Sequence, residues 1–178
     1  MFTKFCLTTS FILFIGLTGY TQSIDTKRSI ASFEISNMKI NAVNGTVKGM
    51  TGHIAFDPDN LEICDFDVCM DATTINTDNS KRDEHLQQQE YFNTELFNDI
   101  CFVSREIRNA EQDGFAVIGS LTMTDVSKDV MIPFTFDGST FTGQLKISRY
   151  DYNIGTDVGK FMIGEQVNIT ITCHLDKS

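Results

Sequence analysis

Residues 167–175 read Val-Asn-Ile-Thr-Ile-Thr-Cys-His-Leu, and this stretch decides the fold class. Every odd-numbered position in it is apolar and every even-numbered position is polar. Because successive side chains of a strand point to opposite faces, this period of two predicts a β-strand with one buried and one solvated face. One-sided strands of this kind are typical of antiparallel sheets.

The same alternation recurs along the rest of the chain. It covers residues 31–35, 54–56, 64–71, 115–123, 130–136 and 141–147. Turn-forming sequences separate these runs, as at residues 57–60 and 137–139. Pro133 cannot donate to a strand ladder, so it predicts a bulge or a locally unpaired stretch. Many short strands joined by tight turns predict one all-β domain, either a sandwich or a closed barrel.

Residues 79–92 interrupt the alternation with polar and charged residues, and none of them is β-branched. Asn79 or Ser80 can cap a helix that begins here. We therefore expect a short helix inserted between two strands. Leu86 should face inward, and the two aromatic residues at the end of the segment should dock on the core.

The first 21 residues have the order of a secretory leader. Lys4 precedes an apolar run at residues 11–17, and small or polar residues follow. The apolar run is shorter than the roughly 20 residues that span a bilayer, which favours a cleaved signal over a retained anchor. We expect cleavage between Thr21 and Gln22, leaving residues 22–178 as one periplasmic or secreted barrel domain with no stable membrane insertion.

The charge of the chain argues against two classes of partner. It carries 14 basic and 24 acidic residues, a formal net charge of −10. Such a chain is repelled by nucleic acids and by anionic membrane surfaces. We therefore expect neither as a partner.

Four cysteines follow the leader: Cys64, Cys69, Cys101 and Cys173. An oxidising compartment permits up to two disulfides, but a core of this size does not need them, and free cysteines are often buried. We slightly favour four free thiols. Cys69 and Cys101 fall on outward faces, so a cross-strand disulfide remains an alternative if their strands pair. Neither the cysteines nor the three histidines have the spacing of a metal site.

The residue pattern leaves the state of the barrel interior open. Eleven phenylalanines remain after the leader, most of them on inward faces. A small barrel is either filled by its own side chains or has room for one ligand, and bulky residues favour a filled interior. Gly119 and Gly143 on otherwise apolar faces either leave a groove for a chain-like ligand or ease strand bending.

Short motifs follow one another in order along the whole mature chain. They include Ser-Ile-Ala-Ser-Phe at 29–33, Gly-His-Ile-Ala-Phe-Asp at 52–57, Arg-Asp-Glu-His-Leu at 82–86 and Ile-Ser-Arg-Tyr-Asp-Tyr-Asn-Ile-Gly at 147–155. This order resembles the YceI-like family of polyisoprenoid-binding, lipocalin-like proteins. The resemblance implies an eight-stranded antiparallel lipocalin-like β-barrel, open at one end, with an isoprenoid or fatty-acyl chain in its lumen. It also implies a bacterial source.

The candidate ligand-binding residues are mainly apolar residues on inward faces. They are Phe33, Ile35, Phe56, Phe66, Val68, Phe102, Phe115, Val117, Phe134, Phe136, Phe141 and Leu145. Arg82 and His85 are added because a spacing of three places them on one side of a helix, where they can meet a polar headgroup. The alternative is that Arg82 and Asp83 pin the helix to the barrel through hydrogen bonds.

Three functions compete at this point. The first is a non-enzymatic carrier of a polyisoprenoid, quinone-like or fatty-acyl ligand, without catalytic residues, metal or cofactor. The second is an enzyme that acts on an isoprenoid or lipid near Arg82 and His85, although no serine–histidine–acid order or paired-carboxylate site is visible. The third is a ligand-free structural barrel, marked by the lack of a connected cavity. The oligomeric state, a homodimer included, stays open.

Overall fold

The computed structural model describes residues 21–37, 41–111, 114–159 and 162–176. The leader therefore lies outside the described residues except for Thr21, and its cleavage stays a prediction. Eight strands make the wall of the fold. They are β2 (Ile30–Asn37), β3 (Asn41–Ala55), β4 (Asp65–Asn76), β5 (Asp99–Asn109), β6 (Phe115–Met123), β7 (Val126–Phe136), β8 (Thr140–Ser148) and β9 (Ile163–His174).

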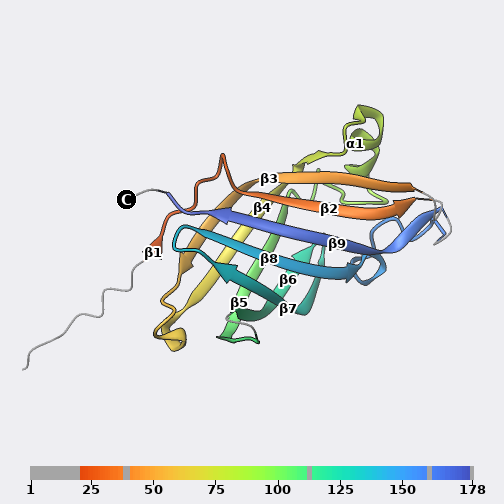
Figure 1. Cartoon of the computed structure of the whole chain (residues 1–178). Coiled ribbons are helices and arrows are strands. Elements are labelled where there is room, and N and C mark those ends of the chain that lie inside the picture. Colours follow the sequence, from red (N-terminus) through yellow and green to blue (C-terminus); the bar gives the residue numbers. More distant parts are fainter. Residues whose placement is uncertain (1–20, 38–40, 112–113, 160–161, 177–178) are drawn as a thin grey trace, which may run out of the picture.

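These eight strands close into an antiparallel barrel (Figure 1). Around the barrel the order is β3, β2, β9, β8, β7, β6, β5 and β4, and β4 pairs again with β3. The two-residue strand β1 (Thr21–Gln22) extends the sheet beside the end of β3. The eight-stranded lipocalin-like barrel predicted from the sequence is confirmed.

Two bulges interrupt the pairing of β3 with β4 between Thr46 and Thr51. Gly49 and Gly52 have positive φ angles of 72° and 123°, which side chains rarely adopt. At Gly52 a β-carbon would also lie only 2.0 Å from the carbonyl oxygen of Asp67. Because of the bulges, the buried positions change from odd-numbered residues such as Val47 to even-numbered residues such as Met50. A search for strict alternation therefore does not detect this strand as a whole.

β7 and β8 pair over three residues only, from Phe134 to Phe136 on β7. Pro133 directly precedes this pairing, and the rest of β7 diverges from β8 (Figure 1). β7 stays paired with β6 through Pro133, so the unpaired stretch expected there is present on the β8 side alone. Proline has no amide hydrogen to donate to a neighbouring strand.

The inserted helix α1 (Ser80–Leu86) is present, and Asn79 caps it by accepting a 3.1 Å hydrogen bond from the Arg82 amide. It ends sooner than the expected segment 79–92. The amide of Phe92 bonds back to the Leu86 carbonyl at 3.0 Å, so the chain turns there. Tyr91 is buried by this turn, and Leu86 and Phe92 pack against the core as expected.

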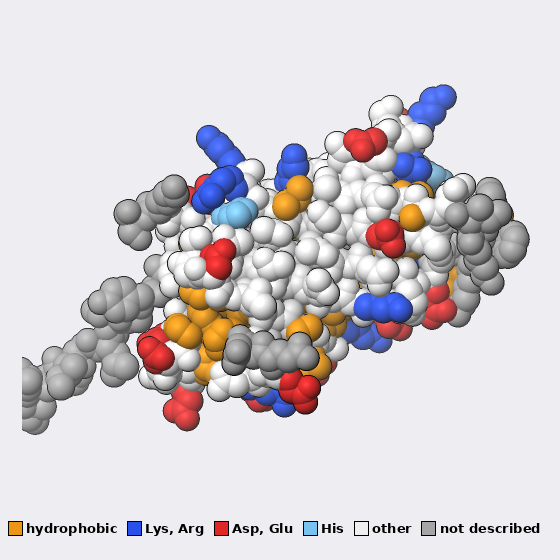
Figure 2. All heavy atoms as spheres, in the orientation of Figure 1, with side chains coloured by type: hydrophobic (Ala, Val, Ile, Leu, Met, Phe, Trp, Pro, Cys, Tyr) orange, Lys and Arg blue, Asp and Glu red, His pale blue; other side chains and the backbone are white. Residues whose placement is uncertain are grey.

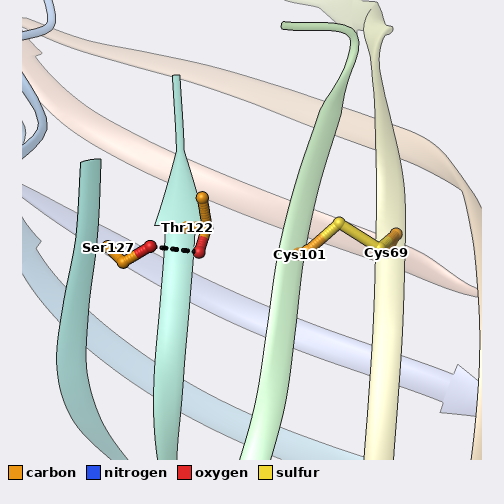
Figure 3. Close-up of a disulfide and its surroundings, with 4 residues drawn as sticks. All are labelled: Cys69, Cys101, Thr122 and Ser127. Carbon is orange, nitrogen blue, oxygen red and sulfur yellow. Dashed lines mark hydrogen bonds between the residues drawn. A yellow bond between two sulfur atoms is a disulfide. The ribbon is translucent and has the colours of Figure 1, made fainter. Parts of the chain in front are cut away.

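A disulfide joins Cys69 on β4 to Cys101 on β5. The two residues are direct partners in the strand register, with their Cα atoms 4.1 Å apart. Figure 3 shows the next two strands of the same outer row, where Thr122 and Ser127 share a 2.7 Å hydrogen bond. The preference for four free thiols is wrong for this pair because the register places the two sulfurs opposite each other. Cys64 and Cys173 are free.

Candidate functional site

An apolar cavity of about 330 Å³ occupies the barrel interior. All eight long strands contribute side chains to its wall, and nearly all of these are aliphatic or aromatic. The outer surface is different: on the face drawn in Figure 2, Lys, Arg, Asp and Glu side chains are scattered over the barrel, and hydrophobic side chains gather mainly at the lower left. Within the described part of the chain, Arg82 and Arg149 are the only charged side chains in the lining, so most of the interior offers an apolar surface of the kind that holds an apolar ligand.

Six phenylalanines form a cluster at one end of the cavity, defined by Phe56, Phe66, Phe115, Phe134, Phe136 and Phe141. Phe56 is its centre and contacts the other five rings with centroid distances of 5.0 to 6.0 Å. Four of the five contacts approach edge to face at 5.0 to 5.6 Å, the geometry that aromatic quadrupoles favour. We call these six residues the phenylalanine cluster.

The opposite end carries the few polar groups of the lining: Ser36, Asn37, Thr77, Arg82 and Arg149. Arg82 donates from Nε to the Thr77 hydroxyl at 2.7 Å and from Nη2 to the Thr77 carbonyl at 2.6 Å. The Asp83 carboxylate accepts from the same hydroxyl and from the Thr77 amide. Asp83 therefore pins α1 to the end of β4, and Arg82 shares this role while lining the cavity.

His85 lies outside the cavity. Its side chain is exposed, its Nε2 lies 3.1 Å from the Glu90 carboxylate, and its ring packs edge-on against Tyr91. The spacing of three did not bring His85 to the ligand side because α1 turns that edge toward solvent. The paired headgroup site expected from Arg82 and His85 is thus reduced to Arg82.

Arg149 is a buried cation that the sequence reasoning did not assign to the site. It begins the 3₁₀ helix η2 (Arg149–Tyr152), is 4% exposed and lines the cavity. Its guanidinium donates to the carbonyl groups of Ile154, Gly155, Val158, Ile163 and Gly164. With its donors used in this way, Arg149 fastens the segment before β9 to the barrel.

Burial moves the pKa values of two further ionisable groups further above neutral pH. Burial raises the pKa of the Cys173 thiol, which lines the cavity, to about 11. Burial also raises the pKa of the Tyr152 hydroxyl to about 12. Neither group adds charge to the interior at neutral pH.

Ten of the fourteen predicted ligand-binding residues line the cavity. They are Phe33, Ile35, Phe66, Val68, Arg82, Phe102, Val117, Phe134, Phe141 and Leu145. The other four are His85 and three members of the phenylalanine cluster, Phe56, Phe115 and Phe136, which lie behind the lining. These three phenylalanines stand at or just beyond the ends of β3, β6 and β7, so alternation placed them inward but not along the lumen. Binding itself stays a prediction for all fourteen.

Several lining residues were missed. Leu121, Ile132 and Ile147 stand on alternating faces of the sequence, so alternation was sufficient to find them. Met50 follows the β3 bulges, and no local pattern marks it. The two glycines expected to leave a groove differ in their surroundings. Gly143 lines the cavity, whereas the Phe102 ring fills the space beside Gly119.

Two classes of site are not found in the described part of the chain. No group of three or more histidine, cysteine, aspartate or glutamate side chains there is placed to hold a metal ion. None of the helices there is long and apolar enough to cross a membrane.

Comparison with known proteins gives a consistent result. The chain matches the YceI-like domain over residues 22–175. Protein YceI of Salmonella newport is 27% identical over 143 residues, which cover 75% of this chain and 74% of that protein. The crystal structure of the Campylobacter jejuni YceI protein is similar with a TM-score of 0.71 and 27% identity, covering 78% of this chain and 88% of that one.

Two more distant structures share the fold alone. Burkholderia cenocepacia BcnA superposes with a TM-score of 0.77 at 21% identity, covering 86% of this chain and 99% of that one. A polyisoprenoid binding domain from Saccharophagus degradans, implicated in plant cell wall breakdown, has a TM-score of 0.66 at 14% identity. That comparison covers 88% of this chain and 98% of the other.

Proposed function

Because this chain belongs to the YceI-like family, we propose that it is an exported carrier that holds a long apolar isoprenoid or related lipid chain in its barrel. The observation that carries the proposal is the apolar cavity of about 330 Å³ inside the barrel. Burial of apolar area contributes roughly 25 cal/mol per Å², so a chain in this lumen gains affinity from its whole length. In a ligand-free structural barrel, an unfilled cavity of this size would only lower the stability of the core.

The polar end of the cavity supports a ligand with one polar head. Arg82 is the lining cation that retains a free donor, because its Nη1 makes no hydrogen bond within the described ranges. The forked guanidinium suits a phosphate, carboxylate or carbonyl oxygen. The proposed ligand therefore lies with its head near α1 and its tail toward the phenylalanine cluster.

Transport or storage without catalysis is part of the proposal. The enzyme alternative relied on Arg82 and His85 acting together, but His85 faces solvent and pairs with Glu90. The export element of the proposal draws on the leader-like residues 1–21 and agrees with the Cys69–Cys101 disulfide, a bond typical of oxidising compartments.

The test is to purify the protein from an exporting bacterial host and to record its native mass before and after organic extraction. We expect a stoichiometric apolar adduct that extraction removes and that added polyprenols or quinones restore. A clean mass together with failure of every added prenol and quinone to bind would refute the carrier function.

A matched pair of variants locates the site. Leu145→Asn places an amide in the cavity wall, and Val103→Asn places the same group on the outer face of β5, where Val103 is 46% exposed. We expect the Leu145 variant to lose the adduct and the Val103 variant to keep it. Circular dichroism checks that both proteins are folded, and equal retention by two folded variants would contradict the assigned site.

A further inference from the structure

We propose that the phenylalanine cluster is a fixed floor that sets the length of the chain the barrel accepts. This inference rests on the proposed carrier function and makes it more specific, because it names the number of isoprene units that fit. Specificity for chain length is then determined by the six residues of the phenylalanine cluster and not by the cavity volume alone.

The cluster divides into two layers. Phe66, Phe134 and Phe141 line the cavity, whereas Phe56, Phe115 and Phe136 do not. Each front ring contacts a rear ring: Phe66 lies 6.0 Å from Phe56, Phe134 stacks on Phe115 at 5.4 Å, and Phe141 stacks on Phe136 at 4.3 Å. A chain that moves down the lumen therefore meets two layers of aromatic rings.

The backbone holds these rings in place. Phe134 with Phe115, and Phe141 with Phe136, are direct partners in the strand register. Phe136 and Phe141 flank the tight turn of residues 137–139, which the Asp137 carboxylate closes through the amides of Ser139 and Thr140. Because this hairpin end is short and paired, the floor cannot open without breaking strand pairing and several ring contacts.

The polar groups of the lining set the orientation of the proposed ligand. All the polar residues of the lining named above lie at the α1 end, and the cluster end is aromatic. A ligand with a polar head thus places its head at α1 and its tail against Phe134 and Phe141. The floor then acts on the tail alone.

The length of the lumen follows from the strands. Cys173, which pairs with Phe141 at the floor, and Ile163 toward the other end both line the cavity and are ten residues apart on β9. At about 3.3 Å per residue this is roughly 33 Å of strand, or about 25 Å along the axis of a barrel whose strands tilt by about 40°. Four carbon–carbon bonds of about 1.5 Å give an isoprene unit an extended length of about 5 Å, so about five units fit.

The first arm of the test uses the unaltered protein. It is incubated with prenols of two, four, six and nine isoprene units, and binding is followed by native mass spectrometry. We expect affinity to rise with chain length up to about five or six units and then to level off. A continued rise from six units to nine overturns the floor, and binding of no prenol at any length overturns the carrier function itself.

The second arm moves the floor. Phe134→Ala removes a front ring and opens space toward the rear layer, whereas Phe102→Ala removes the same ring from the side wall. We expect the Phe134 variant to shift preference toward longer prenols by at least about tenfold, since burial of two more CH₂ groups already gives that factor. The Phe102 variant should keep the original limit.

Two results count against the floor in this arm: an unchanged length preference in the Phe134 variant, or an equal shift in both variants. If Phe134→Ala does not fold, Phe134→Leu shortens the same side chain with less loss of packing and should produce a smaller shift in the same direction. Whether or not these variants fold, the dependence of affinity on prenol length in the unaltered protein still tests the floor.

Discussion

The Cys69–Cys101 disulfide gives the sharpest stability prediction. It joins residues 32 positions apart, and the enclosed segment contains α1 together with Tyr91 and Phe92, which pack at the polar end of the cavity. In the chain-entropy description, closing a loop of this length lowers the entropy of the unfolded chain by an amount worth about 3.7 kcal/mol at 25 °C. Replacing both cysteines by alanine should lower the free energy of unfolding by about that amount.

The measurement is urea unfolding of the oxidised protein and of the double variant Cys69→Ala, Cys101→Ala. The thermal midpoint should fall by about 7–15 °C for a domain of this size. The urea slope should rise, because an unfolded chain without the cross-link exposes more surface. Reduced unaltered protein should behave like the double variant.

The same outer row supplies the control. Thr122→Ala with Ser127→Ala removes one partly exposed hydrogen bond across β6 and β7 (Figure 3), and should cost about 1 kcal/mol. A double cysteine variant whose unfolding free energy lies within about 1 kcal/mol of the oxidised protein would refute the entropic reasoning. That result would mean that residual pairing of β4 with β5 restrains this segment in the unfolded chain even without the disulfide.

Three other predictions concern single residues. Asn79→Ala removes the helix cap and should lower unfolding free energy in urea by about 1 kcal/mol, whereas Asn79→Asp should retain most of it. Arg149→Met leaves buried carbonyl groups unpaired and should cost about 3 kcal/mol or more in the same assay; an equally stable variant contradicts the anchoring role. Tyr152 has a pKa of about 12 in the fold against 10.0 ordinarily, so its contribution to stability is complete below pH 10 and is lost as the pH rises toward 12. Tyr152→Phe should remove that part of the alkaline loss, and an unchanged pH profile would count against it.

Much of the site was accessible from the sequence because inward faces follow a local rule. Phe66 and Val68 on β4, and Phe141 and Leu145 on β8, stand two or four positions apart on unbroken strands, so alternation identified them correctly as lining residues. The rule failed at β3 and β5. There, bulges at Gly49 and between Ser104 and Glu106 shift the inward face by one residue, and the composition of the strand does not signal where.

Alternation also could not separate the wall of the cavity from its floor. Phe56 and Phe134 have the same local signature, a phenylalanine on an inward face, but only Phe134 reaches the lumen. The difference is the height of each residue in the barrel, which the stagger of eight strands sets. His85 shows the same limit on a helix, because its spacing from Arg82 is fixed locally while the rotation of α1 is set by Thr77 and Asp83.

The sequence by itself determined the all-β class, the outward polar face, the capped helix and the break at Pro133, because each depends on a residue and its near neighbours. Only the tertiary structure decided that Cys69 meets Cys101, that Arg149 is buried among carbonyl groups, and that the barrel encloses a cavity instead of filling it. These features depend on strand register and closure. Contacts between residues far apart along the chain fix both, and no local pattern encodes them.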